Sequence, residues 1–237
     1  MSNNALAFYL DAPLQAWGAS SRFQRRETEA FPTKSGILGL ISAAMGIDKH
    51  SPDEPEQLRS LGTLKFSVLR VEKKSGAVQR LSDFHTIGGG WHDNWKQDKG
   101  NLVAKMQTPR KAGDDSPFGT VITHRAYLTD AKFIAVLEGE ESVVERVAAA
   151  LENPKWGVWY GRKCCLPAAP LSPVVASTPT EAIHALVIRF GLDDTDPNAA
   201  QGQEESDGDG AWFPSDQPIS FGKREYQSRP VRRKLSE

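Results

Sequence analysis

Basic and aromatic residues cluster around the start of a predicted helix near the N-terminus. Three arginines lie between a Trp-Gly pair and a Thr-Lys-Ser-Gly sequence, which leads into an apolar pattern with helical spacing. A helix N-terminus favours anions, so cations that converge there predict a phosphate site. The alternative is ordinary helix caps, a core tryptophan and solvated arginines. The candidate residues are Trp17, Gly18, Arg22, Arg25, Arg26, Thr33, Lys34, Ser35 and Gly36.

A second candidate region, residues 85–123, is rich in Gly, Lys, Asp and Trp and has no sustained period. Its glycines can act as a hinge, and its aromatic and basic residues can stack on and neutralise a flexible partner. The alternative is an irregular loop whose tryptophans have no such role. The residues concerned are Gly88, Gly89, Gly90, Trp91, Trp95, Lys105, Arg110 and Lys111.

Catalysis has weaker support in the sequence. His85, His124, Tyr127 and Lys132 are the side chains that can act as general acids or bases, but their spacing does not show that they converge. The chain has no G-x-x-x-x-G-K-[ST], H-E-x-x-H or G-x-S-x-G motif, and its two cysteines, Cys164 and Cys165, are adjacent. We therefore expect no metal, no cofactor and no nucleotide hydrolysis.

The overall charge hides a strong asymmetry. The formal net charge is −1, but residues 192–216 contain eight acidic residues and no Lys or Arg, so the rest of the chain carries +7. This remainder is basic enough to bind phosphate groups. The acidic segment has little apolar surface and is predicted to be a disordered loop.

The elements that must position these residues follow a β-α-β-β-α-β order. Strands are predicted at 5–10, 63–72, 131–138 and 183–190, with the second and third inside a sheet, and helices at 33–46 and 141–153. This order predicts an α+β, ferredoxin-like fold, with 85–123 inserted as a thumb. The predicted domain spans 1–182, and 183–237 holds the last strand, the acidic loop and a basic C-terminal hairpin.

The N-terminus and composition predict a cytoplasmic protein. No apolar run approaches the ~20 residues of a membrane span, and the first apolar segment lacks the features of a signal peptide. The adjacent cysteines would form a bridge only with strain, which fits a reducing compartment.

Five fragments in one order resemble a known family. They are LQAWG (14–18), FPTKSGILGLI (31–41), DFHT (83–86), THRAYLTDA (123–131) and YGRKCCLPAAPL (160–171). Together they resemble the CasD family of type I-E CRISPR complexes. The resemblance implies a subunit that binds the 5′ handle of CRISPR RNA, caps a filament of CasC subunits, contacts CasA and meets target DNA through the assembled complex.

The resemblance also implies a noncatalytic role, because a separate subunit, CasE, processes the RNA. A related branch in type I-C complexes is a metal-independent ribonuclease, which is the alternative function, and a protein-protein scaffold is a third. On the RNA-binding interpretation, Lys34→Ala and Arg162→Ala lower RNA retention without unfolding the chain. The predicted RNA-binding residues are the set around the start of the first helix together with Gln15, His85, Thr86, His124, Arg125, Tyr160, Arg162 and Lys163.

Overall fold

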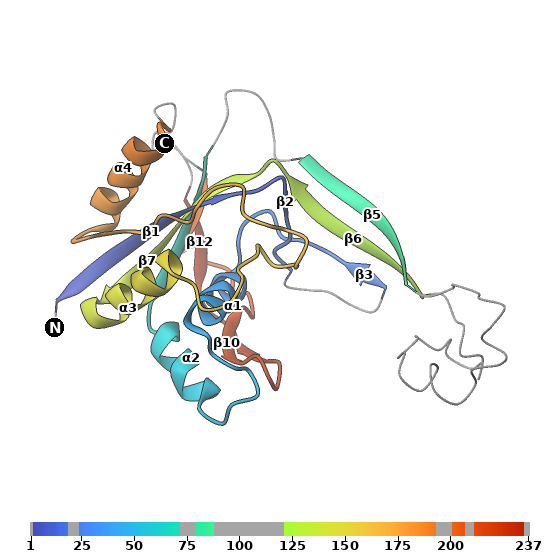
Figure 1. Ribbon diagram of the computed structural model, residues 1–237, viewed down its shortest axis with the longest axis horizontal. Helices are drawn as coiled ribbons and strands as arrows, with labels where there is room; N and C mark the ends of the chain where they lie inside the picture. Colours follow the sequence, from blue (N-terminus) through green and yellow to red (C-terminus); the bar gives the residue numbers. More distant parts are fainter. Residues whose placement is uncertain are drawn as a thin grey trace.

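The computed structural model describes residues 2–18, 24–71, 79–87, 121–192, 201–206 and 211–234. A sheet with helices on both faces forms the body, and a long hairpin extends from it (Figure 1). The elements in chain order are β1 (Asn3–Asp11), β2 (Leu14–Gln15), β3 (Arg25–Arg26), α1 (Lys34–Met45), α2 (Glu54–Gly62), β4 (Lys65–Arg70), β5 (Gln79–Ile87), β6 (Val121–Thr129), β7 (Lys132–Glu140), α3 (Glu141–Glu152), β8 (Val174–Ala176), α4 (Pro179–Phe190), β9 (Gly202–Glu205), β10 (Gln217–Ser220), β11 (Glu225–Gln227) and β12 (Val231–Lys234).

The main sheet has six strands in the order β12-β9-β4-β7-β1-β8, and every neighbouring pair is antiparallel. The predicted α+β class is therefore confirmed. The strands predicted at 63–72 and 131–138 are β4 and β7, and both lie inside the sheet, as expected.

Strand β1, next to the edge strand β8, is buried on both faces. Successive side chains of a strand point to opposite faces, so Leu6, Phe8 and Leu10 pack in the core that contains α1 and α3 residues. Ala5, Ala7 and Tyr9 pack in a second core with residues of α4. The continuous apolar run of β1 thus serves two separate layers.

Helix α1 begins and ends where the sequence predicts. The Thr33 hydroxyl accepts a hydrogen bond from the Gly36 amide at 3.2 Å, and Gly46 ends the helix in the left-handed conformation (φ 71°). Helix α3 likewise ends before Asn153-Pro154, as predicted.

The strand predicted at 183–190 is wrong, because this segment is the second half of α4. The Thr178 hydroxyl caps the helix at the Glu181 amide, Pro179 occupies its first turn and Gly191 ends it. These start and stop signals agree with a helical burial pattern of Ala182, Ile183, Leu186 and Val187. The strand that pairs with the outer edge of β1 is β8, only three residues long.

The predicted disordered loop at 192–216 is also wrong in part, because Gly202–Glu205 forms β9 between β4 and β12. Its polar residues are paired with the side chains of other elements: Glu204 with Arg232, and Glu205 with Lys34. Asp216, at the other end of the acidic segment, is only 3% exposed. Residues 193–200 and 207–210 lie outside the described part.

Strands β5 and β6 form a long hairpin that overlaps both ends of the predicted thumb range, 85–123. All nine residues of β5 pair with β6, from Gln79 with Thr129 to Ile87 with Val121. The short strand β2 pairs with β6 at its base, and β3 pairs with the middle of β6. The hairpin projects away from the body in Figure 1, and residues 88–120 lie outside the described part.

The C-terminal hairpin of β10 and β11 is fixed to helix α2 by a buried carboxylate. Glu54, 1% exposed, accepts hydrogen bonds from the Ser220 hydroxyl at 2.6 Å and from the Phe221 and Gly222 amides at 2.7 and 3.2 Å. Three donors satisfy the buried charge, so the turn of the hairpin is held rigidly. No helix within the described ranges is long and apolar enough to cross a membrane.

A buried cluster of four charged residues joins α1, β9 and the C-terminal segment. The Lys34 ammonium lies 3.0 Å from Glu205 and donates to the Gly62 carbonyl at 3.1 Å. Asp216 accepts from the Lys34 backbone amide at 2.8 Å and pairs with Arg229 at 2.7 Å. Burial lowers the pKa of Lys34, and the Glu205 carboxylate opposes that shift.

We predict that Lys34→Met lowers the free energy of unfolding by about 3 kcal/mol, since removing one partner of a buried pair leaves the other without full compensation. The measurement is urea denaturation followed by circular dichroism. Lys65→Met, at an exposed position on β4, is the matched control and should change stability by less than about 0.5 kcal/mol. Equal unfolding midpoints for the two variants would show that the cluster contributes nothing.

Candidate nucleic-acid interface

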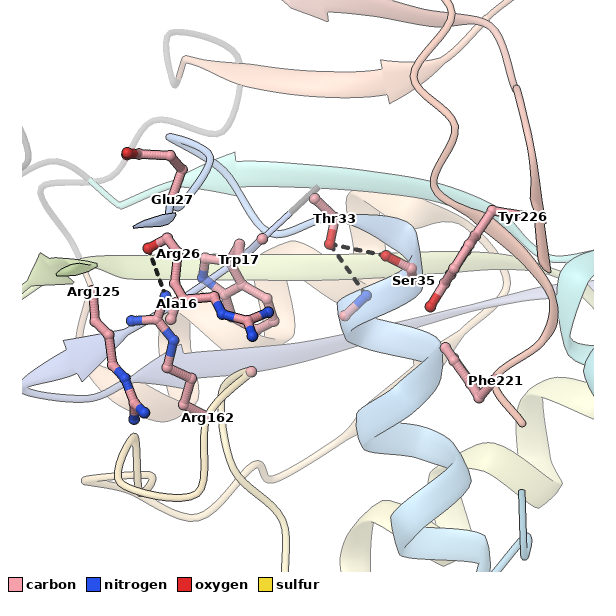
Figure 2. Close-up of a pocket in the computed structure, with 13 residues that line it drawn as sticks. Ala16, Trp17, Arg26, Glu27, Thr33, Ser35, Arg125, Arg162, Phe221 and Tyr226 are labelled. Atoms are coloured by element: carbon pink, nitrogen blue, oxygen red, sulfur yellow. Dashed lines mark hydrogen bonds between the residues drawn. The ribbon is translucent and has the colours of Figure 1, made fainter. Parts of the chain in front are cut away.

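A cleft of about 440 Å³ lies where the base of the hairpin, the start of α1 and the C-terminal hairpin meet. Figure 2 shows the residues that line it. They come from segments far apart in the sequence: Ala16, Trp17, Gly18, Arg26, Glu27, Thr33, Ser35, Gly36, Arg125, Gly161, Arg162, Phe221 and Tyr226. Many of the residues of the first candidate site therefore meet in one place.

Three arginines from three different segments form one end of the cleft. Strands β3 and β6 run parallel with Arg26 opposite Arg125, which brings two like charges together at the same point of the sheet. Arg162 belongs to the loop that follows α3 and also lines the cleft. Across the described ranges, no ion pair joins these guanidinium groups to a carboxylate, and the side chain of Glu27 points away from them in Figure 2.

Arg162 holds two strands together and also contributes charge. Its guanidinium donates to the carbonyls of Ala126 on β6 and Arg26 on β3, both at 2.8 Å, and lies 4.5 Å from the centre of the Tyr127 ring. Neutral carbonyls accept these bonds, so the positive charge is not cancelled. The group is thus held in a fixed position with its charge available to an anion.

Gly161 lets the Arg162 loop reach the cleft. Its φ is +89°, and a Cβ at this position would lie 1.7 Å from the Ala16 carbonyl oxygen. The backbones of the two segments also bond to each other here, because the Ala16 amide donates to the Tyr160 carbonyl at 3.0 Å. A glycine is required here both by the backbone angle and by the space.

The first turn of α1 forms the middle of the cleft. Thr33 caps the helix, and its hydroxyl also lies 3.3 Å from that of Ser35. A Cβ on Gly36 would lie 2.7 Å from the Trp17 ring, so this glycine allows the helix to pack on Trp17. Gly36 therefore has a structural role at the helix start.

The far end of the cleft is formed by Phe221 and Tyr226, which sequence reasoning missed. Their rings meet edge to face with centroids 6.4 Å apart. Both belong to the C-terminal hairpin, about 190 residues after the first turn of α1. The only sequence signal was their position within a basic tail, and nothing in it indicated which part of the body they touch.

Several predicted RNA-contacting residues are instead structural. Lys34 is fully buried in its ion pair, so its predicted contact with RNA is not available to the side chain. Trp17 donates to Gln15 at 2.9 Å, and Gln15 donates to the Ala131 carbonyl at 2.6 Å. Tyr160 is fully buried, which raises its pKa, and its ring stacks near Trp17 at 5.9 Å.

Other predicted residues lie outside the cleft. Arg25 is exposed beside His124 on the neighbouring strand, and Lys163 lies over the Trp159 ring. His85 and Thr86 belong to β5, where Thr86 is exposed. Outside the described part are Arg22, Gly88, Gly89, Gly90, Trp91, Trp95, Lys105, Arg110 and Lys111.

The four candidates for acid-base catalysis are not brought together. His124 pairs with Phe84 and His85 with Thr123, so the two imidazoles point to opposite faces of the hairpin. Burial raises the pKa of Tyr127, and a hydrogen bond to Asp11 raises the pKa of Lys132, which forms an ion pair with Asp11 at 3.0 Å. Neither residue is thereby favoured as a base at neutral pH.

The cysteines are both free, and burial raises the pKa of Cys165 to about 11. A thiol with that pKa is protonated at neutral pH and is a poor nucleophile or metal ligand. In the described residues, no group of three or more His, Cys, Asp or Glu is arranged to hold a metal ion.

Comparison with known proteins identifies the family of the chain. Residues 5–232 match the family model described as CRISPR-associated protein (Cas_Cas5). The chain belongs to this family. The match includes every segment that lines the cleft, from Ala16 to Tyr226.

The Cas_Cas5 chain is 29% identical to the CRISPR system Cascade subunit CasD of Escherichia coli (strain K12) over 188 residues, 75% of each protein. The predicted resemblance to CasD is confirmed. A solved chain of a CRISPR RNA-guided surveillance complex is similar in structure, with 27% identity and a TM-score of 0.65 over 97% of this chain and 88% of that one. A Cas protein crystal structure has 25% identity and a TM-score of 0.61 over 98% and 94%.

We predict that Gly161→Ala destabilises this Cas_Cas5 chain by more than about 1 kcal/mol, because alanine fits neither the positive φ nor the contact with the Ala16 carbonyl. Thermal unfolding would measure the loss. Gly157→Ala is the matched control, since its Cβ would meet only the Trp159 ring at an ordinary 3.7 Å. A Gly161→Ala protein as stable as the Gly157→Ala protein would contradict the required close approach.

Proposed function

We propose that this protein is the CasD-type subunit of a bacterial Cascade surveillance complex and binds the 5′ handle of CRISPR RNA without cutting it. The observation that carries the proposal is the convergence of Arg26, Arg125 and Arg162 at one end of a cleft, with their charges uncompensated by ion pairs in the described part. Like charges held together favour an anionic ligand, and single-stranded RNA supplies closely spaced phosphates.

The fold and the family also support the proposed role. The strands β8-β1-β7-β4, with α1 and α3 packed on one face, support a ferredoxin-like RNA-binding domain with β5 and β6 as the base of a thumb. Membership of the family and similarity to CasD support CasC and CasA as neighbouring subunits, and contact with target DNA through the assembled complex in the cytoplasm.

The first test is RNA binding by the purified chain, measured by fluorescence anisotropy with a labelled RNA that begins with the repeat-derived handle of the host. We predict that Arg125→Ala weakens binding about tenfold or more, since a hydrogen bond to a charged group contributes about 1.5–3 kcal/mol. The slope of log K against log salt should also become shallower by about 0.7 for each phosphate that the variant no longer neutralises.

Arg59→Ala, at an exposed position on α2 outside the cleft, is the control and should leave both affinity and salt slope unchanged. The same result for Arg125→Ala, in a folded protein, would overturn the assignment of the cleft. Failure of the folded parent protein to bind the labelled RNA at low salt would favour the scaffold function over RNA binding.

The noncatalytic role has its own test. Because His85 and His124 point to opposite faces of the hairpin, we predict that a precursor RNA stays intact during prolonged incubation with the purified chain, with or without a chelator. Gel analysis of end-labelled precursor would detect a cut. Cleavage that persists with a chelator and is lost in His124→Ala would instead support the metal-independent ribonuclease of the type I-C branch.

A further inference from the structure

The two ends of the cleft differ in chemistry, and this difference specifies the kind of ligand. Arg26, Arg125 and Arg162 lie on one side of the Trp17 ring and the α1 N-terminus, and Tyr226 and Phe221 lie on the other (Figure 2). A simple anion would contact only the arginine end, and an apolar group would contact only the aromatic end. The cleft of about 440 Å³ lies within the range of ~300–1,000 Å³ that is usual for sites of small ligands.

Tyr226 is held as a rigid surface rather than as a mobile side chain. The residue is 42% exposed, and its ring meets Phe221 edge to face. The residues of the turn, Phe221 and Gly222, are bound through their amides to the buried Glu54 carboxylate. A ring fixed in this way can stack on a base with little loss of entropy on binding.

Hydroxyl groups lie between the two ends. The Tyr226 hydroxyl points toward the first turn of α1, where Ser35 lies (Figure 2). Within the described ranges, no residue forms a hydrogen bond with the Tyr226 hydroxyl, which belongs to the lining of the cleft and can bind a ligand there. Burial raises its pKa, so it remains a hydrogen-bond donor at neutral pH.

We propose that the cleft is a subsite for one ribonucleotide unit of the bound RNA, in which the three arginines bind phosphate, Tyr226 stacks on a base and the hydroxyls of Tyr226 and Ser35 contact the ribose. This inference rests on the proposed RNA-binding function and assigns an orientation to it. Tyr226 is then a determinant of RNA over DNA at a single position of the strand, because only RNA carries the 2′-hydroxyl.

The test combines protein variants with RNAs that each lack one base. A series of handle RNAs, each with one abasic site, is titrated against the full-length parent, Tyr226→Ala and Tyr226→Phe. We expect Tyr226→Ala to weaken the intact RNA about tenfold, the usual scale of base-aromatic stacking. At one position of the RNA, the abasic site should weaken binding to the parent protein but not to Tyr226→Ala.

Tyr226→Phe keeps the ring and loses only the hydroxyl. It should retain the base effect and should lose the preference for RNA when that nucleotide is replaced by its deoxy form. Trp156→Ala removes an aromatic side chain that is 45% exposed outside the cleft, and serves as the control, with unchanged affinity for all RNAs.

The outcomes separate this inference from the proposed function. If Arg125→Ala weakens binding but Tyr226→Ala does not, the protein binds RNA and the nucleotide subsite is wrong. If Tyr226→Ala weakens all abasic RNAs by the same factor, the ring has only a structural role and the subsite is also wrong. If neither variant affects binding, the cleft is not the RNA site, and if the folded parent protein does not bind the RNA at low salt, the proposed function fails as well.

Discussion

Burial of the Lys34 ammonium organises the part of the molecule that forms the cleft. A charge without solvent needs a close counter-ion and further hydrogen bonds, and the ammonium finds them in Glu205 of β9 and the Gly62 carbonyl of α2. Asp216 of the C-terminal segment binds the backbone amide of the same residue. Satisfying this one residue therefore fixes the start of α1 against segments more than 170 residues later in the chain. The acidic segment contributes to the fold because its carboxylates are counter-ions for this interior.

Neighbouring side chains in the first turn of α1 point in different directions and have different roles. Lys34 points into the body, while Thr33 and Ser35 line the cleft on the other side. Asp216 already accepts from the Lys34 amide, so a protein carboxylate occupies part of the anion-favouring end of the helix. The arginines, rather than the helix dipole, then supply most of the attraction for phosphate.

Local patterns were reliable where one segment contained all of its own signals. The apolar run of β1, the Thr33 and Gly46 caps of α1 and the amphipathic pattern of α3 all led to the correct element. The β-branched residues within 183–190 favour a strand, but the Thr178-Pro179 start, the Glu181 position and the Gly191 stop favour the helix that forms. Those cap signals were present in the sequence and agreed with a helical period.

The class of fold, the family resemblance and the identity of the basic residues follow from the sequence alone, because they depend on local periodicity and on residue types in order. The tertiary structure was needed to tell which cations face solvent: Lys34 and Arg229 neutralise the carboxylates of Glu205 and Asp216, whereas Arg26, Arg125 and Arg162 converge in the cleft. It also brought Tyr226 to the first turn of α1. Both outcomes depend on long-range pairing, such as β3 with β6 and the hairpin with Glu54, which no local pattern encodes.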